Sequence, residues 1–211
     1  MDHRHICTYP RRVEPPEESQ DSHAAPRPET PAPELTAALV ERGLMDTRKL
    51  PWVAAHWLAD GNGAAGLAEF AGLHGTEPEL TNAWRCLLPE LGVGLLDLPV
   101  GRTVMPWAAE QVHSGAATTA WLVQALWPDH DRPDEALDRV IYQLDIAVEY
   151  AGNLREEAAS PAPARWRSLR QPTSQADLLK HANDIDDAIR RAVRALAEGD
   201  LEAAEDSLKV R

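Results

Sequence analysis

Apolar side chains recur at helical spacing from Asp134 to Ala151, and this feature restricts the fold more than any other. Six apolar residues fall on one helix face there: Leu137, Val140, Ile141, Leu144, Val148 and Ala151. Residues 175–198 repeat the pattern as a heptad-like series, which we call the C-terminal seam: Leu178, Ala182, Ile185, Ile189, Ala192 and Leu196. Gly199 and Asp200 then provide a turn before a further apolar face. The C-terminal residues 174–211 are therefore predicted to form an αα-hairpin.

Helical patterns also precede this region, separated by glycine and proline. The predicted helices cover residues 35–42, 48–60, 64–73, 76–91, 106–113 and 116–127. Thr47 is expected to cap the second helix, and Thr76 with Glu79 is expected to form a capping box. Residues 93–104 are interpreted as a loop. The predicted fold is all-α: an irregular helical bundle with a C-terminal αα-hairpin.

Two segments differ in composition from the predicted helices. Residues 1–34 contain seven of the 17 prolines and almost no large apolar side chains, which predicts a disordered N-terminal tail. Residues 158–173 are rich in proline and alanine and are interpreted as a linker. The predicted organisation is a tail at 1–34, a helical body at 35–157, this linker, and the hairpin.

Charge and cysteine content restrict the partner and the compartment. The net charge of −13 argues against a nucleic-acid partner, because phosphate would be repelled, and it suits a basic protein partner. Two cysteines do not make a disulfide framework, and no secretory signal or apolar run near the ~18 residues of a membrane span is visible. We therefore expect a cytoplasmic protein that binds no membrane.

No pattern of side chains predicts a catalytic site, a metal site or a cofactor. His3, His5 and Cys7 are ligand-type residues, but they form a single set in the predicted tail. His56 and His113 have no serine, cysteine or acidic residue at a spacing diagnostic of catalysis. We therefore expect no cofactor and no metal, and a non-enzymatic role is favoured.

Two regions are candidate partner-binding sites. The first is the C-terminal seam, through Leu178, Ile185, Ile189 and Leu196; a hairpin alone buries little, so the seam must lie against the body, a second copy or another protein. The second is the basic patch Arg165, Trp166 and Arg167, since tryptophan and arginine are favoured interface anchors. Trp166 docking on the body is the alternative.

Two classes of function fit these features. The first is a non-catalytic interaction protein, such as an immunity protein, an antitoxin or a regulatory adaptor, that acts by helix-face docking or self-association. The second is a small helical enzyme, or an accessory protein of a biosynthetic cluster, with a pocket between helices.

The run Leu50–Gly61 (LPWVAAHWLADG), followed by Gly66–Gly75 (GLAEFAGLHG), resembles an uncharacterised group of small helical bacterial proteins. Residues 107–127 are similar to the segment that follows in that group. The resemblance covers about residues 45–130 and implies a helical fold. It implies no activity and transfers no functional residue.

Overall fold

The structure, a computed structural model, describes residues 30–127, 133–160 and 174–209. Within these ranges all regular elements are helices, so the predicted all-α fold is confirmed. Most of the expected tail, residues 1–29, lies outside the described residues. Its predicted end is corrected, because α1 already begins at Pro33. The backbone carbonyl of Pro31 also accepts a hydrogen bond from Trp57 Nε1 at 2.9 Å, which ties this segment to the helical body.

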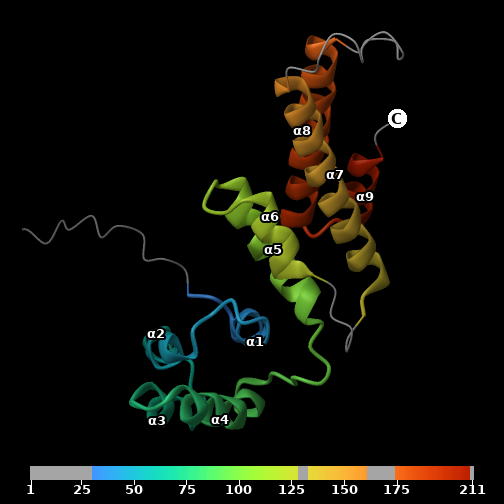
Figure 1. Ribbon diagram of the computed structural model, residues 1–211. Helices are drawn as coiled ribbons and strands as arrows, with labels where there is room; N and C mark the ends of the chain where they lie inside the picture. The colour runs from blue at the N-terminus through green and yellow to red at the C-terminus, as the bar shows by residue number, and fades with distance from the viewer. Residues whose placement is uncertain (1–29, 128–132, 161–173, 210–211) are drawn as a thin grey trace, which may run out of the picture.

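The first half of the chain builds one hydrophobic cluster, shown at the lower part of Figure 1. Its elements are α1 (Pro33–Glu41), η1 (Thr47–Lys49), α2 (Leu50–Ala59), α3 (Leu67–Ala71), α4 (Glu77–Leu87) and η2 (Leu88–Leu91). Trp84 is buried at its centre, with ring centroids 6.0 Å from Trp57 and 5.9 Å from Phe70. Aromatic pairs at such distances add to the stability gained from burial alone.

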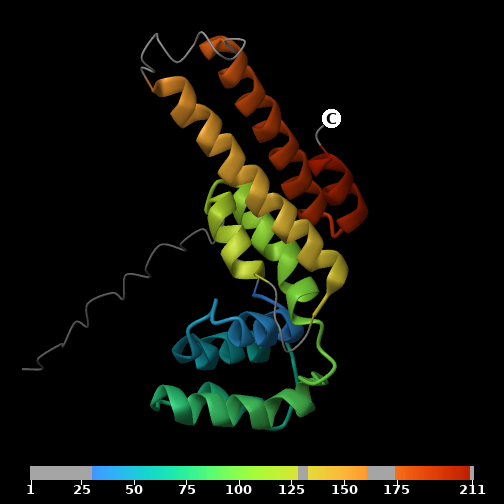
Figure 2. The same cartoon turned by 45° about the vertical axis from the view of Figure 1, so that its right-hand side comes forward.

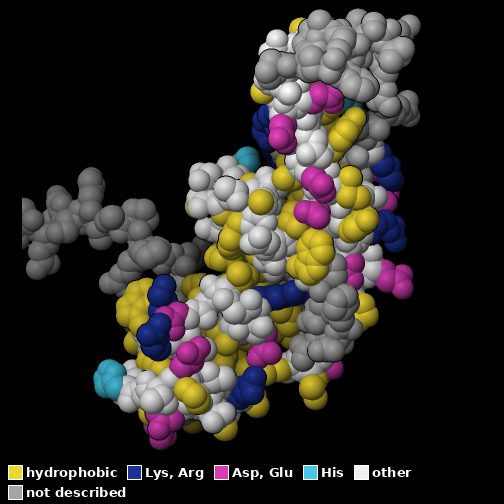
Figure 3. Space-filling model, in the orientation of Figure 1, with side chains coloured by type: hydrophobic (Ala, Val, Ile, Leu, Met, Phe, Trp, Pro, Cys, Tyr) yellow, Lys and Arg dark blue, Asp and Glu magenta, His cyan; other side chains and the backbone are white. Residues whose placement is uncertain are grey.

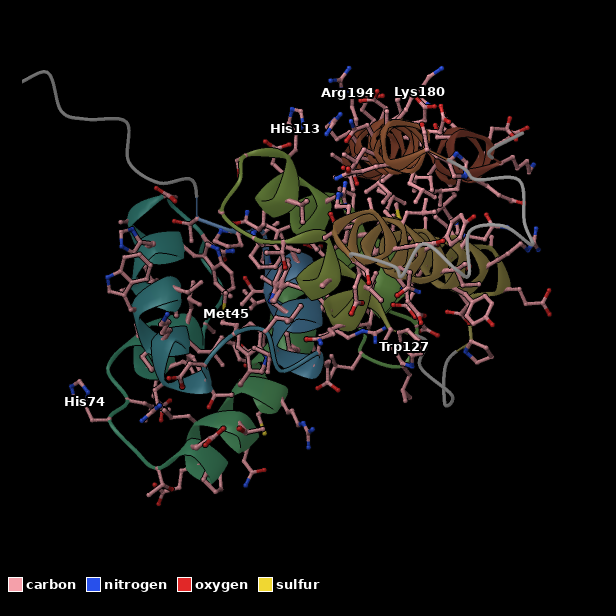
Figure 4. The ribbon with its side chains drawn as sticks, turned by 45° about the horizontal axis from the view of Figure 1, so that its top comes forward. Met45, His74, His113, Trp127, Lys180 and Arg194 are labelled. Atoms are coloured by element: carbon pink, nitrogen blue, oxygen red, sulfur yellow. The ribbon has the colours of Figure 1, made fainter. Side chains whose placement is uncertain are left out.

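The second half builds a larger cluster, to which α1 contributes Ala38 and Leu39. Its elements are α5 (Val100–His113), α6 (Thr119–Leu126), α7 (Glu135–Ala159), α8 (Gln175–Ala197) and α9 (Leu201–Leu208). The long helices α7 and α8 lie side by side, with α5 and α6 toward one side and α9 on the other (Figures 1 and 2). Met45 packs against both clusters and lies inside the molecule in Figure 4.

Three predicted boundaries differ from the structure because tertiary burial extends the helices. The predicted loop 93–104 is wrong at its end: α5 begins at Val100, since Val100 and Val104 are buried in the larger cluster. This burial outweighs the cost of Pro106 inside the helix, which is about 3 kcal/mol in a typical helix. Helix α7 likewise continues past Ala151 to Ala159, with Leu154 buried, so the linker begins later than expected.

Of the two helix caps predicted from the sequence, the one at Thr76 is present in the structure and the one at Thr47 is not. Glu79 accepts a hydrogen bond at 2.8 Å from the backbone N–H of Thr76, as the capping box predicts, and a second at 2.8 Å from the Thr76 hydroxyl. Thr47 is not the cap of its helix: Asp46 accepts from the Arg48 N–H at 2.9 Å, and Thr47 is buried. A carboxylate accepts more strongly than a hydroxyl, and it also pairs with the Arg48 side chain at 2.8 Å.

The C-terminal hairpin is part of the larger cluster and does not form a separate unit. Ile185, Ile189 and Leu196 are between 0% and 7% exposed, and α8 packs against both α5 and α7. The chain's own body therefore covers the C-terminal seam, which is the intramolecular alternative among the three expected. The prediction that Ile189 and Leu196 bind a partner is therefore corrected, because the body supplies enough apolar surface to bury both side chains.

Candidate docking groove

A line of large apolar side chains on α7 is exposed to solvent. Tyr142, Ile146 and Tyr150 are 60%, 48% and 49% exposed, and their spacing of four residues places them on one face of the helix. We call these three residues the α7 stripe. Single exposed apolar side chains are ordinary, but a contiguous group indicates an interaction site.

A groove lies beside the α7 stripe, between α7, α8 and the C-terminal end of α9. It has a volume of about 520 Å³. Its lining residues are Gln143, Ile146, Ala147 and Tyr150 from α7, His181 and Ile185 from α8, and Leu208 and Lys209 from the end of α9. The rings of Tyr150 and His181 meet edge to face across it, with centroids 5.8 Å apart and an angle of 80° between planes. The groove therefore has an apolar floor and an aromatic wall.

The groove exists because α9 is much shorter than its neighbours. Helix α7 has 25 residues and α8 has 23, whereas α9 has eight. Helix α9 packs on both, and the ion pair of Arg139 with Glu205 at 3.4 Å fixes it near the start of α7. Past Leu208, α9 no longer covers the two long helices, and there the groove is open.

Exposed carboxylates lie on α7 and α8 near the groove, outside its lining residues. Glu149 and Glu157 lie on α7, one turn after Ile146 and two turns after Tyr150; Asp177 and Asp184 lie one turn before and after His181 on α8. All four residues are exposed, and we call them the rim carboxylates. The face shown in Figure 3 has hydrophobic side chains along α7 with acidic side chains beside them.

Of the nearby cations, Lys180 acts on this rim: hydrogen bonds from Ser174 and then the charge of Lys180 lower the pKa of the Asp177 carboxyl. Lys209 is paired with Asp206 at 2.8 Å and with Glu205 at 3.7 Å, and the hydrogen bond that its amine donates to Asp206 raises the pKa of that amine. Lys180 and Arg194 point away from α7 on the outer side of α8 (Figure 4). The open half of the groove is therefore apolar at its floor and negative at its edges.

One polar atom within the groove region lacks a partner. The side-chain oxygen Oε1 of Gln143 is buried and accepts no hydrogen bond from the described residues. A buried acceptor left unpaired typically costs about 1–3 kcal/mol. Gln143 therefore contributes less to the folded state than an apolar side chain of the same shape would.

The predicted partner-binding residues contribute little to this groove. Ile185 forms part of its floor, Leu178 is half-buried against the larger cluster, and Ile189 and Leu196 are core residues. Arg165, Trp166 and Arg167 lie outside the described residues, as do His3, His5 and Cys7. Sequence analysis missed the α7 stripe, although the i, i+4, i+8 spacing of two tyrosines and an isoleucine is visible in the sequence.

His56 and Asp134 each contact neighbouring residues in ways that need no catalytic role. The ring of His56 packs against that of Trp52 on α2 at a centroid distance of 4.0 Å, with an angle of 60° between planes. Asp134 caps α7 by accepting from the Leu137 N–H at 3.2 Å and pairs with Arg102, which lowers the pKa of the Asp134 carboxyl. In the described part of the chain, no three His, Cys, Asp or Glu side chains are grouped as metal ligands would be. Helices long and apolar enough to cross a bilayer are also absent from that part.

No known protein family, curated protein or solved structure matches this chain. The resemblance of residues 45–130 to small helical bacterial proteins gains no support from these comparisons.

Proposed function

We propose that this chain is a non-catalytic interaction protein that docks a segment of another protein in the groove between α7, α8 and α9. Immunity proteins, antitoxins and regulatory adaptors are the classes that act in this way. The α7 stripe carries the proposal, because three large apolar side chains in line are 48% to 60% exposed beside an open groove. Aromatic side chains are enriched in the buried centre of protein interfaces.

Exposure of the α7 stripe is costly for a chain with no partner. Burying a large apolar side chain fully contributes about 1.5–3 kcal/mol, so three half-exposed side chains leave a comparable amount to be gained on docking. The groove also supplies a preformed floor, Ile185 and Ala147, which is held by the helix packing of the larger cluster. Docking therefore needs little rearrangement of the main chain.

Site-specific photo-crosslinking in the native host tests this proposal. A photoreactive phenylalanine analogue replaces Ile146 in the full chain, and in a control chain it replaces Trp52, which is 57% exposed on α2. We expect one crosslinked protein from position 146, absent from position 52 and lost when Tyr150→Gln is added. Equal crosslinking from both positions would contradict the proposal.

The convergence of polar groups on the groove favours a second candidate, a small helical enzyme or an accessory protein of a biosynthetic cluster. His181, Tyr150 and Gln143 all line the cavity, and polar groups that converge on an apolar pocket are typical of ligand sites. For that function His181→Ala would abolish ligand binding, and crosslinking from position 146 would capture no protein.

A further inference from the structure

We propose that the occupant of the open half of the groove is a single basic amphipathic α-helix from another protein, laid in line with α9. This inference rests on the proposed docking function and specifies the chemistry of the partner. Two independent observations support it: α9 packs against the same two helices, α7 and α8, and the rim carboxylates lie on those helices beside the part that α9 leaves open.

Helix α9 shows what kind of element the groove accepts. It lies against α7 and α8 and buries Ala204 completely, with Leu201 and Leu208 partly buried on the same side. The groove begins where α9 ends, because Leu208 and Lys209 line it. A helix continuing in the direction of α9 would meet Ile146, Tyr150 and Ile185 with its apolar face.

The length of α7 beyond α9 fits three to four helical turns. The lining of the groove on α7 ends at Tyr150 and the helix continues to Ala159, so that the stretch from Ile146 to Ala159 is about 20 Å long at the helical rise. A helix of about 13–15 residues covers this distance. Its apolar face contacts the α7 stripe at its lower end, and its polar face meets Glu157 and Asp177 at its upper end.

Charge complementarity makes this helix basic. Glu149, Glu157 and Asp184 form no salt bridge with any described residue, and Asp177 binds the hydroxyl of Ser174. The free backbone carbonyls at the C-terminal end of α9 add partial negative charge at the junction. Lysine or arginine on both flanks of the partner helix would meet these groups.

Charge also argues against a second copy of this chain as the occupant. Each chain has a net charge of −13, and α9, the chain's own helix of this type, has Glu202, Glu205 and Asp206 on its surface. Bringing such a helix to the rim carboxylates would place like charges side by side. A basic helix from another protein avoids this repulsion and gains in association rate from the attraction.

Three labelled peptides of about 15 residues test the inference with the full chain, by fluorescence anisotropy at physiological salt. The first has leucines at i, i+3, i+4 and i+7 in a lysine–alanine background. The second replaces each lysine with glutamate, and the third scrambles the first sequence. We expect the basic amphipathic peptide to bind at least tenfold more tightly than the other two.

Variants then locate the binding site. Ile146→Gln and Tyr150→Gln should each weaken binding of the basic peptide about fivefold, since each removes apolar contact from the groove. The rim double variant Glu149→Lys with Asp184→Lys should weaken it roughly fivefold or more. The matched control is Asp60→Lys, directly after α2, with Glu69→Lys on α3. Both residues are exposed, and this variant should leave binding unchanged.

Several results would overturn the inference. Equal binding of the glutamate peptide would show that the partner is not basic. Equal binding of the scrambled peptide would show that the groove does not recognise the apolar face of an amphipathic helix. Equal weakening by the rim and control doubles would indicate diffuse attraction to an acidic protein. A dimer that Tyr150→Gln dissociates, seen by light scattering, would make a second copy the occupant. Crosslinking from position 146 is independent of all these results, so the docking function can survive while the partner chemistry fails.

Discussion

Two glycines inside helices should respond in opposite ways to the same substitution. Gly152 lies in α7, and a Cβ added there would have no heavy atom within 4 Å. Gly101 lies in the first turn of α5, and a Cβ there would be 2.8 Å from Leu137 Cδ2 and 3.3 Å from Arg42 Nη2. The first position is open, whereas at the second the first turn of α5 meets the side chain of Leu137 from α7.

The expected magnitudes follow from these distances. Gly152→Ala should stabilise the protein by about 0.5–1 kcal/mol, because alanine loses less backbone entropy in a helix. Gly101→Ala makes a similar gain but forces the side chain of Leu137, which is 1% exposed, out of its position. Overpacking of this kind costs about 1–3 kcal/mol, so the net change should be a loss of roughly 1–2 kcal/mol.

Urea denaturation followed by far-UV circular dichroism measures both free energies of unfolding. The midpoint should rise for Gly152→Ala and fall for Gly101→Ala, with the slope unchanged in both. In thermal melts each kcal/mol should shift the midpoint by about 2–4 °C for a chain of this size. If Gly101→Ala is as stabilising as Gly152→Ala, then the close approach of Gly101 to Leu137 is wrong.

Three further predictions concern the core, a cap and the groove. Leu196→Ala removes a fully buried side chain from α8 and should cost about 2–5 kcal/mol in a single cooperative transition; a separate early transition of the hairpin would contradict its place in the larger cluster. The backbone N–H and hydroxyl of Thr76 lower the pKa of the Glu79 carboxyl, so its stabilisation is present above the unfolded pKa of about 4.3 and is lost as the pH falls through the lower folded value. The difference in thermal midpoint between the wild type and Glu79→Gln should therefore shrink on acidification, and a difference independent of pH would refute the capping role. Gln143→Met should leave the free energy of unfolding unchanged or raise it, because the unpaired Oε1 is removed; a loss above about 1 kcal/mol in urea denaturation would show that this oxygen has a partner.

The all-α fold and the buried faces of α7 and α8 could be predicted from the sequence because a 3.6-residue period directly reports which face is covered. The same period does not say what covers it. Ile185 and Ile189 show this: their spacing fits a partner, a second copy or the chain's own body, and only the arrangement of α5 and α7 decides among them.

Short sequence patterns predicted the structure wrongly where packing against residues distant in the sequence determines it. Pro106 indicates a helix start in the sequence, but the burial of Val100 and Val104 moves that start six residues upstream, from 106 to 100. The groove was hidden for a related reason. Tyr142, Ile146 and Tyr150 have the spacing of a buried face, and their exposure follows from the short length of α9, which leaves them uncovered.

Hydrogen–deuterium exchange of the full chain, alone and with the protein captured by crosslinking, tests the docking function most directly. The account predicts that added protection falls on α7 between Tyr142 and Tyr150 and on α8 around His181, with exchange in α2, α3 and α4 unchanged. Protection confined to α2, α3 and α4, or no added protection on α7 despite binding, would contradict it.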